Sequence, residues 1–296
     1  MISRRPGLKR EEYRAAVILL LPASIGLILF SFIPILQALQ LSFYDAPLLS
    51  TQRTFVGLEN YATALSDPVF IRAMLNTVVY AVEAVILQVL VALALALLIR
   101  NYYPGIGFFR SAYFLPVVTS LVVVSTVWKI MYHTENGLIN SVLRTAALPS
   151  IPWLTSPDVA LWSIVILGLW KEVGFSMLVL LGGLHSIPRD YYEAAAIDGA
   201  TGGRSFWHIT LPLLRRAMLF VVVLSTINAF KLFTPVYVMP DGGPSDSTQT
   251  MVFYIFQSVF RYFKMGYASA LSFLLLILVL ILAAIQFRLF RSDVEN

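Results

Sequence analysis

The sequence predicts an all-α integral membrane protein that crosses the bilayer with six helices. Of its 296 residues, 58% are hydrophobic and only 12% are charged, whereas a soluble domain carries roughly a quarter charged residues. The apolar residues gather in six runs, and each run is long enough to span a bilayer, which takes about 20 residues of helix. The runs cover approximately 15–41, 71–99, 108–131, 159–184, 211–239 and 267–289.

The basic residues predict the orientation of these spans. With six spans both termini lie on one side, and that side would hold 13 Lys and Arg residues against 5 on the other. Basic loops are retained in the cytoplasm. We therefore expect cytoplasmic tails at 1–14 and 291–296, with a transmembrane domain over 15–290 between them. This asymmetry accounts for the net charge of +5 without a nucleic-acid partner.

Three loops are expected on the outer side. The first, 44–70, is too short to be a domain. The second, 132–158, carries three prolines and is expected to be mostly irregular. The third begins with a sharp turn at 240–244. It continues into the aromatic-rich segment 251–263, which we expect to lie as a helix at the outer membrane interface, where aromatic residues settle.

Residues that would carry enzyme chemistry are missing from the sequence. There is no phosphate-binding loop of the G-x-x-x-x-G-K-[ST] type. There is also no cysteine, which excludes disulfides and thiolate metal sites. The three histidines, His133, His185 and His208, lie far apart in the sequence. We therefore expect neither an enzyme nor a metal or cofactor site on this chain.

Charged residues interrupt the spans at Glu83, Lys171, Glu172 and Lys231. Such groups are costly in lipid and normally face protein or water. They indicate either a polar translocation path or structural pairs, for example Lys171 with Glu83, and Lys231 could also snorkel outward. Ser225, Asn228 and Lys231, spaced by three, predict a polar stripe on the fifth helix. The candidates for a substrate path are Lys171, Glu172, Ser225, Asn228 and Lys231.

The loop between the fourth and fifth spans contains a short helix with well-defined ends. Pro188 suits the first turn of a helix, where its missing N–H is harmless. Residues 191–197 continue the helix, and Asp198-Gly199 ends it, because Gly199 can adopt the left-handed conformation. A two-turn helix is marginal alone, so we expect it to sit in a groove of a partner. An ordinary cytoplasmic loop is the alternative.

The same loop carries ten residues of a spaced motif. The motif comprises Glu193, Ala194, Ala195, Asp198, Gly199, Ala200, Phe206, Ile209, Leu211 and Pro212. It resembles the coupling loop of the permease subunits of bacterial ATP-binding-cassette (ABC) importers. Weaker elements, in the same order along the chain, resemble the maltose- and glycerol-phosphate-type carbohydrate permeases over about residues 12–290. These elements are Gly57–Tyr61, Asn76-Thr77, Pro116, Gly137–Asn140 and Gly242–Pro244.

The resemblance implies a type I ABC importer permease fold with a core at about 71–290 and a cytoplasmic coupling helix in the loop 186–212. It implies a multi-pass protein of the bacterial plasma (inner) membrane that imports a sugar or a related polyol. The implied partners are a second, homologous permease, two ATPase subunits that bind ATP and Mg, and an external substrate-binding protein. The residues implied in ATPase coupling are Glu193, Ala194, Ala195, Asp198, Gly199 and Ala200.

Two other functions remain compatible with the spans alone. An ion-coupled secondary transporter or channel could use Glu83, Lys171 and Glu172 as a charge relay. A membrane scaffold would need no transport path. The coupling motif favours the importer, because neither alternative needs a helix that docks on an ATPase.

Overall fold

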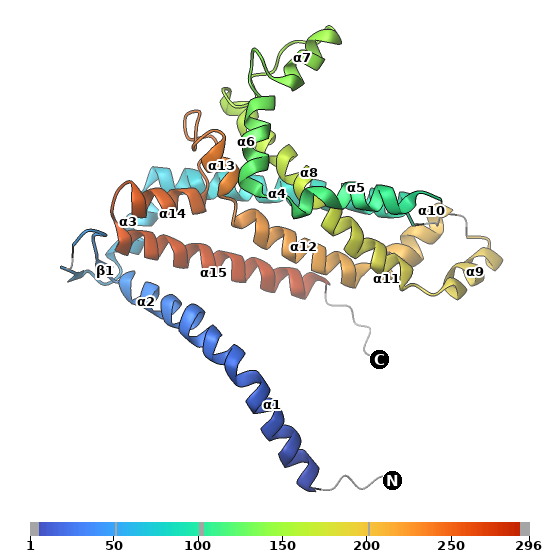
Figure 1. The fold of residues 1–296 in the computed structure, drawn as a ribbon, viewed down its shortest axis with the longest axis horizontal. Helices are drawn as coiled ribbons and strands as arrows, with labels where there is room; N and C mark the ends of the chain where they lie inside the picture. Colours follow the sequence, from blue (N-terminus) through green and yellow to red (C-terminus); the bar gives the residue numbers. More distant parts are fainter. Residues whose placement is uncertain (1–5, 51, 101–103, 201, 291–296) are drawn as a thin grey trace. The chain divides into compact units, whose positions relative to one another are not determined.

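The computed structural model describes residues 6–50, 52–100, 104–200 and 202–290. The chain is mostly helical (Figure 1). It divides into two compact units. The first comprises Met1–Ala64 and Ser258–Phe273, and the second comprises Leu65–Gln257 and Leu274–Asn296.

The first unit begins with a long apolar helix. Helix α1 (Pro6–Leu27), the π-helical turn η1 (Ile28–Phe32) and helix α2 (Ile33–Leu41) follow one another without a break. The stretch Tyr13–Leu41 is long and apolar enough to cross a membrane. Its large side chains are exposed, as at Phe30. An apolar helix whose backbone is hydrogen-bonded internally is stable in lipid, so this stretch corresponds to the first predicted span.

A polar residue organises the first outer loop within this unit. The Asn60 side chain donates to the carbonyls of Ser42 and Tyr44, at 2.9 and 3.0 Å. It thereby fixes the end of α2 and the strand that follows. The elements of this loop are β1 (Tyr44–Asp45), its antiparallel partner β2 (Thr54–Phe55) and helix α3 (Glu59–Ser66).

In the second unit the long helix α8 (Pro157–His185) packs against α4 (Pro68–Leu98) and α5 (Ile106–Val118) (Figure 1). Helix α12 (Arg215–Phe230) packs against both α4 and α8. The remaining elements are α6 (Leu121–Met131), α7 (Leu138–Thr145), α9 (Arg189–Ile197), α10 (Gly202–Ser205), η2 (Phe206–Thr210), α11 (Leu211–Leu213), α13 (Thr234–Val238), α14 (Met251–Phe260) and α15 (Met265–Phe290), of which the last two extend into the first unit.

Glycines allow α8 to approach its neighbours closely. A Cβ added at Gly174 would lie 2.0 Å from the carbonyl oxygen of Tyr113 on α5. A Cβ at Gly183 would lie 2.8 Å from the Cβ of Ala217 on α12. Membrane helices associate through such small residues, because no hydrophobic effect drives them together in lipid. Helix α8 is accordingly the most deeply buried of the long helices that the structure describes.

The third predicted span, 108–131, is not one straight helix. Helices α5 and α6 are bent by 98° at Thr119 and Ser120, whose ψ angles of 153° and 127° are extended. These two small polar residues interrupt the apolar run only briefly, so the run still reads as one span. The other predicted spans correspond to five long helices. Six spans result when the bent pair is counted as one.

The predicted second loop, 132–158, contains one short helix within irregular backbone. Helix α7 forms because all three prolines lie beyond residue 148. The buried side chain of Asn140 donates to the carbonyls of Thr134 and Ile151, both at 2.9 Å. Its oxygen accepts from the Ile151 amide and the Trp153 indole, both at 3.0 Å. Outside α7 and the first residues of α8 the loop is irregular, so the expectation of a mostly irregular loop is confirmed, with one short helix added.

The aromatic-rich segment 251–263 was expected at the outer membrane interface, but protein buries much of it. Helix α14 ends at Phe260, and Met251 and Phe253 are fully buried. The Phe253 ring packs 6.3 Å from that of Phe233. The Met251 amide donates to the Thr77 hydroxyl at 2.9 Å. Aromatic residues serve equally well in a core, so their abundance did not distinguish the two locations.

Candidate functional site

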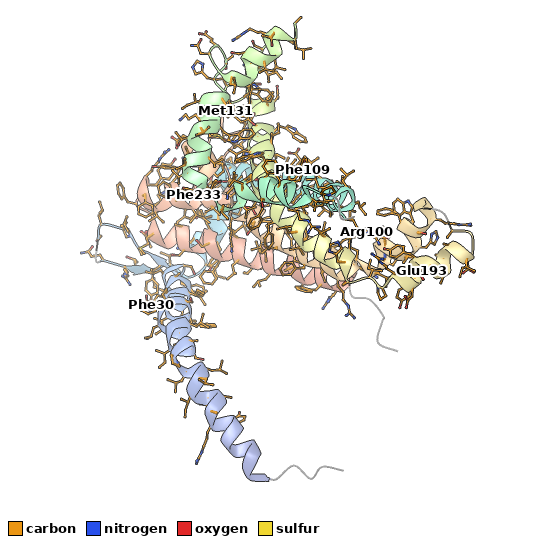
Figure 2. The ribbon with its side chains drawn as sticks, turned by 45° about the vertical axis from the view of Figure 1, so that its right-hand side comes forward. Phe30, Arg100, Phe109, Met131, Glu193 and Phe233 are labelled. Carbon is orange, nitrogen blue, oxygen red and sulfur yellow. The ribbon has the colours of Figure 1, made fainter. Side chains whose placement is uncertain are left out.

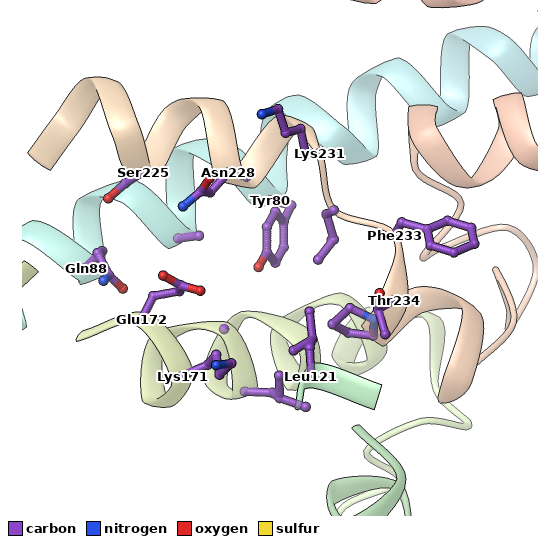
Figure 3. Close-up of a pocket in the computed structure, with 16 residues that line it drawn as sticks. Tyr80, Gln88, Leu121, Lys171, Glu172, Ser225, Asn228, Lys231, Phe233 and Thr234 are labelled. Atoms are coloured by element: carbon purple, nitrogen blue, oxygen red, sulfur yellow. The ribbon is translucent and has the colours of Figure 1, made fainter. Parts of the chain in front are cut away.

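A cavity of about 280 Å³ lies between α4, α8 and α12 of the second unit (Figure 3). Its lining combines polar and charged side chains from the three helices with apolar residues. The five residues predicted from the sequence to form a substrate path all border it, namely Lys171, Glu172, Ser225, Asn228 and Lys231. The structure thus brings them together. Whether they contact a substrate stays a prediction.

The polar stripe of α12 faces this cavity. Ser225 and Asn228 extend from α12 toward Glu172 on α8 (Figure 3). Asn228 is exposed. Neither its amide nor the Glu172 carboxylate makes a side-chain hydrogen bond to another described residue, so both remain available to a solute. Lys231 follows the last residue of α12, where a cation is favoured by the helix dipole.

Lys171 has a different environment from the other four. Its side chain is buried, and its ammonium donates to the carbonyls of Pro116 and Val117, at 2.8 and 2.7 Å. These carbonyls lie at the end of α5, where the regular helical bonds stop, and the Pro116 carbonyl also accepts from the Thr119 amide at 3.2 Å. The Thr119 hydroxyl also donates to the Pro116 carbonyl, at 2.5 Å. Lys171 therefore holds the break between α5 and α6 rather than offering a free charge.

Glu83 is not part of this arrangement. It does not line the cavity, and among the described residues its buried Oε2 has no hydrogen-bond partner. The structural pair with Lys171, which the sequence left open, is not found in the described part of the chain, because the Lys171 ammonium is bonded to backbone carbonyls. A relay through Glu83, Lys171 and Glu172 has no support in this geometry.

Two lining residues escaped the sequence analysis, Tyr80 and Gln88 on α4 (Figure 3). The Gln88 amide donates to the Ser176 hydroxyl at 3.0 Å. A Cβ at Gly168 would lie 2.6 Å from the Tyr80 hydroxyl, so this glycine makes room for the phenol. Gln88 could have been noticed as a polar residue within an apolar span. Tyr80 could not, because aromatic residues are common in spans.

Irregular backbone also borders the cavity. Helix α12 ends at Phe230 and α13 begins at Thr234, and the residues between them lie in the lining, as do Thr234 and Pro235. Non-helical backbone at membrane depth is tolerated only where protein buries it or where it lines a water-filled cavity. This break therefore supports a polar rather than a lipid-filled space.

The predicted coupling helix is present as α9, and both of its ends are explained by local bonds. Pro188 precedes it with an extended ψ of 141°, and Gly199 follows it with a φ of +74°. The amide of Gly199 donates to Ala196 at 3.1 Å, and that of Ala200 donates to Ala195 at 2.8 Å. These two bonds form a Schellman motif, which satisfies carbonyls at the helix end.

Helix α9 has no buried residue and lies at one end of the second unit (Figure 2). Ile197 is 87% exposed, and Trp207 in the following η2 is 65% exposed. Exposed apolar side chains beside polar ones such as Glu193 are typical of a protein-binding surface. A Cβ at Gly199 would meet no atom of this chain within 4 Å. The positive φ, rather than lack of space, therefore requires glycine here.

No group of three or more His, Asp or Glu residues that could hold a metal ion occurs within the described ranges.

Comparisons with known proteins give one consistent result. A sequence model of the family described as "Binding-protein-dependent transport system inner membrane component" matches residues 63–292. The chain is 34% identical to the probable ABC transporter permease protein YurN of Bacillus subtilis (strain 168), over 94% of this chain and 96% of that protein. It is 32% identical to the trehalose/maltose transport system permease protein MalF of Thermococcus litoralis, over 97% of each.

One solved structure shares the fold across the whole chain. It is the crystal structure of a bacterial alginate ABC transporter in complex with an alginate pentasaccharide-bound periplasmic protein. One of its chains superposes with a TM-score of 0.84 at 21% identity, over 99% of both chains. This likeness confirms the importer-permease fold predicted from the sequence.

The role of Lys171 can be tested by its stability effect. Lys171→Met keeps the length of the side chain but removes the donor to two carbonyls. We expect a loss of about 1.5–3 kcal/mol, the range for a hydrogen bond to a charged group, and a lower melting temperature in detergent. Lys231→Met, the same change at an exposed lysine, should melt like the wild type. Equal melting of both variants would contradict the structural role.

Proposed function

We propose that this chain, which belongs to the family of binding-protein-dependent transport system inner membrane components, carries a sugar or a related polyol into the cell. The observation that carries the proposal is the single polar cavity lined by all five path residues. Relatives support the substrate class, because they include permeases named for trehalose/maltose, lactose and sn-glycerol-3-phosphate.

The chemistry of the lining suits a neutral polyhydroxyl solute. The charged groups among the lining residues are one carboxylate, Glu172, and two ammoniums, Lys171 and Lys231, of which Lys171 is already bonded to two backbone carbonyls. Ser225, Asn228 and Gln88 add hydroxyl and amide groups that can both donate and accept hydrogen bonds. Such groups match sugar hydroxyls.

Transport would be driven by ATP hydrolysis on a separate ATPase subunit, coupled through the loop 193–212. Helix α9 would seat in a groove of that subunit, with Glu193, Ala194, Ala195, Asp198, Gly199 and Ala200 as the coupling residues. Binding of ATP would then favour one of two arrangements of the spans, because a ligand shifts a conformational equilibrium by its differential affinity. The exposed Ile197 and Trp207 support such a contact.

The proposed assembly contains further subunits. A second, homologous permease would complete the path, two ATPases would bind ATP and Mg, and an external binding protein would deliver the substrate. The periplasmic protein in the alginate transporter structure supports the last of these. The chain itself would contribute no cofactor and no catalytic residue.

The chain is a multi-pass membrane protein, and we place both termini in the cytoplasm. The 13-to-5 asymmetry of basic residues favours this orientation. The coupling loop and the end of α15 then lie on the cytoplasmic side, and the loop 240–250 lies outside.

Coupling is tested at Gly199. Gly199→Asp forces an acidic residue into a φ of +74°, which costs about 1–2 kcal/mol, and adds a charge at the contact. We expect about a tenfold loss of transport-coupled ATPase activity, with the protein still in the membrane. Gly199→Asn, whose side chain tolerates the left-handed region without charge, is the control and should lose less. Full coupling in Gly199→Asp would count decisively against the contact.

The substrate path is tested at Asn228. Asn228→Ala removes one exposed amide, and the loss of one hydrogen bond should weaken transport by about two- to tenfold. The loss is measured as uptake of a panel of labelled neutral sugars and polyols by the reconstituted complex, together with its assembly and basal ATPase activity.

Thr226→Val is the control for this prediction. The Thr226 hydroxyl is bonded to Gln286 at 2.8 Å and lies outside the lining, so stability rather than uptake should change. Wild-type uptake in Asn228→Ala would remove the residue from the path.

The orientation is tested with cysteines in a chain that has none of its own. Ser245 and Gly203 are both exposed. An impermeant maleimide added to intact cells should label Ser245→Cys and leave Gly203→Cys unlabelled, and inverted vesicles stripped of partner subunits should show the opposite. Labelling of Gly203→Cys from outside would overturn the orientation.

A further inference from the structure

A contact joins α9 to the end of α4. The guanidinium carbon of Arg100, which follows α4, lies 4.5 Å from the centroid of the Tyr192 ring in α9. A cation over an aromatic face is attracted by the negative face of the ring's quadrupole. The carbonyl of Arg100 also accepts from Nε2 of His185, the last residue of α8, at 3.1 Å. Arg100 is thereby fixed from two sides and lies beside the helix that carries Glu193 (Figure 2).

The same tyrosine reaches a second element through its hydroxyl. The Tyr192 hydroxyl lies 3.0 Å from the hydroxyl of Thr210. Thr210 is 2% exposed and ends η2, and η2 leads through α11 into α12. Tyr192 therefore contacts the end of α4 with its ring face and the approach to α12 with its polar tip.

The other residues of α9 make few contacts with the rest of the second unit. Helix α9 has no buried residue. Within the described ranges, Tyr192 carries the only side-chain hydrogen bond and the only cation contact recorded for this helix. Apart from the chain connections at its two ends, such a helix acts on its neighbours through the side chains that touch them.

The geometry points to Tyr192 as the positioning residue that passes movement of α9 to two walls of the cavity. The Arg100 contact leads to α4, which carries Tyr80, Ala84 and Gln88, and the Thr210 contact leads to α12, which carries Ser225 and Asn228. This inference rests on the proposed function, in which an ATPase moves α9. It adds the residue and the two routes by which that movement reaches the cavity.

The two routes can be read separately with cysteine reporters in the assembled complex. Ala84→Cys reports on α4, and Ser225→Cys reports on α12. The rate of maleimide labelling is measured with and without ATP and vanadate, which trap the ATPases, so no substrate is needed. The nucleotide response of a reporter is the change in its labelling rate caused by ATP and vanadate. We expect Arg100→Gln to reduce this response at Ala84→Cys by at least about fivefold, the lower end of ordinary coupling factors. The response at Ser225→Cys should be unchanged.

Tyr192→Phe keeps the ring and removes the hydroxyl, so it should show the reverse pattern and lose the response at Ser225→Cys alone. Tyr192→Leu should lose both responses. Tyr13→Leu, at a tyrosine of α1 that is 75% exposed, is the matched control and should keep both. Arg100→Gln and Tyr192→Phe retain most of each side chain, so they decide the matter even if Tyr192→Leu does not assemble.

Wild-type responses in both Arg100→Gln and Tyr192→Phe would overturn the inference while leaving the proposed function standing. Equal losses at both reporters in both variants would overturn the division into two routes. A wild-type complex without any nucleotide response would contradict the proposed function itself, so the two failures are distinguishable.

Discussion

The structure of the second unit depends on how two backbone carbonyls are satisfied at the bend between α5 and α6. In an apolar environment an unpaired carbonyl costs several kcal/mol; the Pro116 carbonyl has partners in Thr119, but that of Val117 depends on Lys171. The Lys171 ammonium bonds both, and it reaches them because Gly174 lets α8 approach α5. The bend then places Leu121, the first residue of α6, in the cavity lining. One buried lysine thus supports the wall of the site and donates to the backbone there.

The ends of α9 could be predicted from the sequence, whereas the bend could not. Pro188 and Gly199 act on residues within a few positions of themselves, so their effect on the helix is visible in the sequence. The bend falls at two small polar residues, Thr119 and Ser120, within a long apolar run, and the lysine that stabilises it lies 55 residues from Pro116. Lys171 itself was noticed as an in-span charge, but its partners depend on which helices pack together, and hydropathy does not specify that packing.

The cavity lining also shows that the sequence does not reveal which face of each helix meets a neighbour. Ser225 and Asn228 share one face of α12, as their spacing predicted, and Lys231, which follows the end of the helix, lines the same cavity. On α4 the lining residues Tyr80, Ala84 and Gln88 follow one another at intervals of four, which places them on one helical face. Glu83 attracted notice as a charge, yet it is displaced by about 100° from Ala84. Which face of α4 meets the cavity is set by its packing against α8 and α12.

Two irregular stretches of backbone, separated by more than a hundred residues, border the same cavity. One is the bend before Leu121, and the other joins α12 to α13 through Lys231 and Phe233. A bilayer-spanning chain tolerates non-helical backbone where protein or water satisfies it, and at the first stretch Lys171 supplies the partners. At the second, side chains and backbone face an open space that also receives Asn228 and Glu172. The two breaks in the spans therefore border the space in which, under the proposed function, a polar solute would find hydrogen-bond partners.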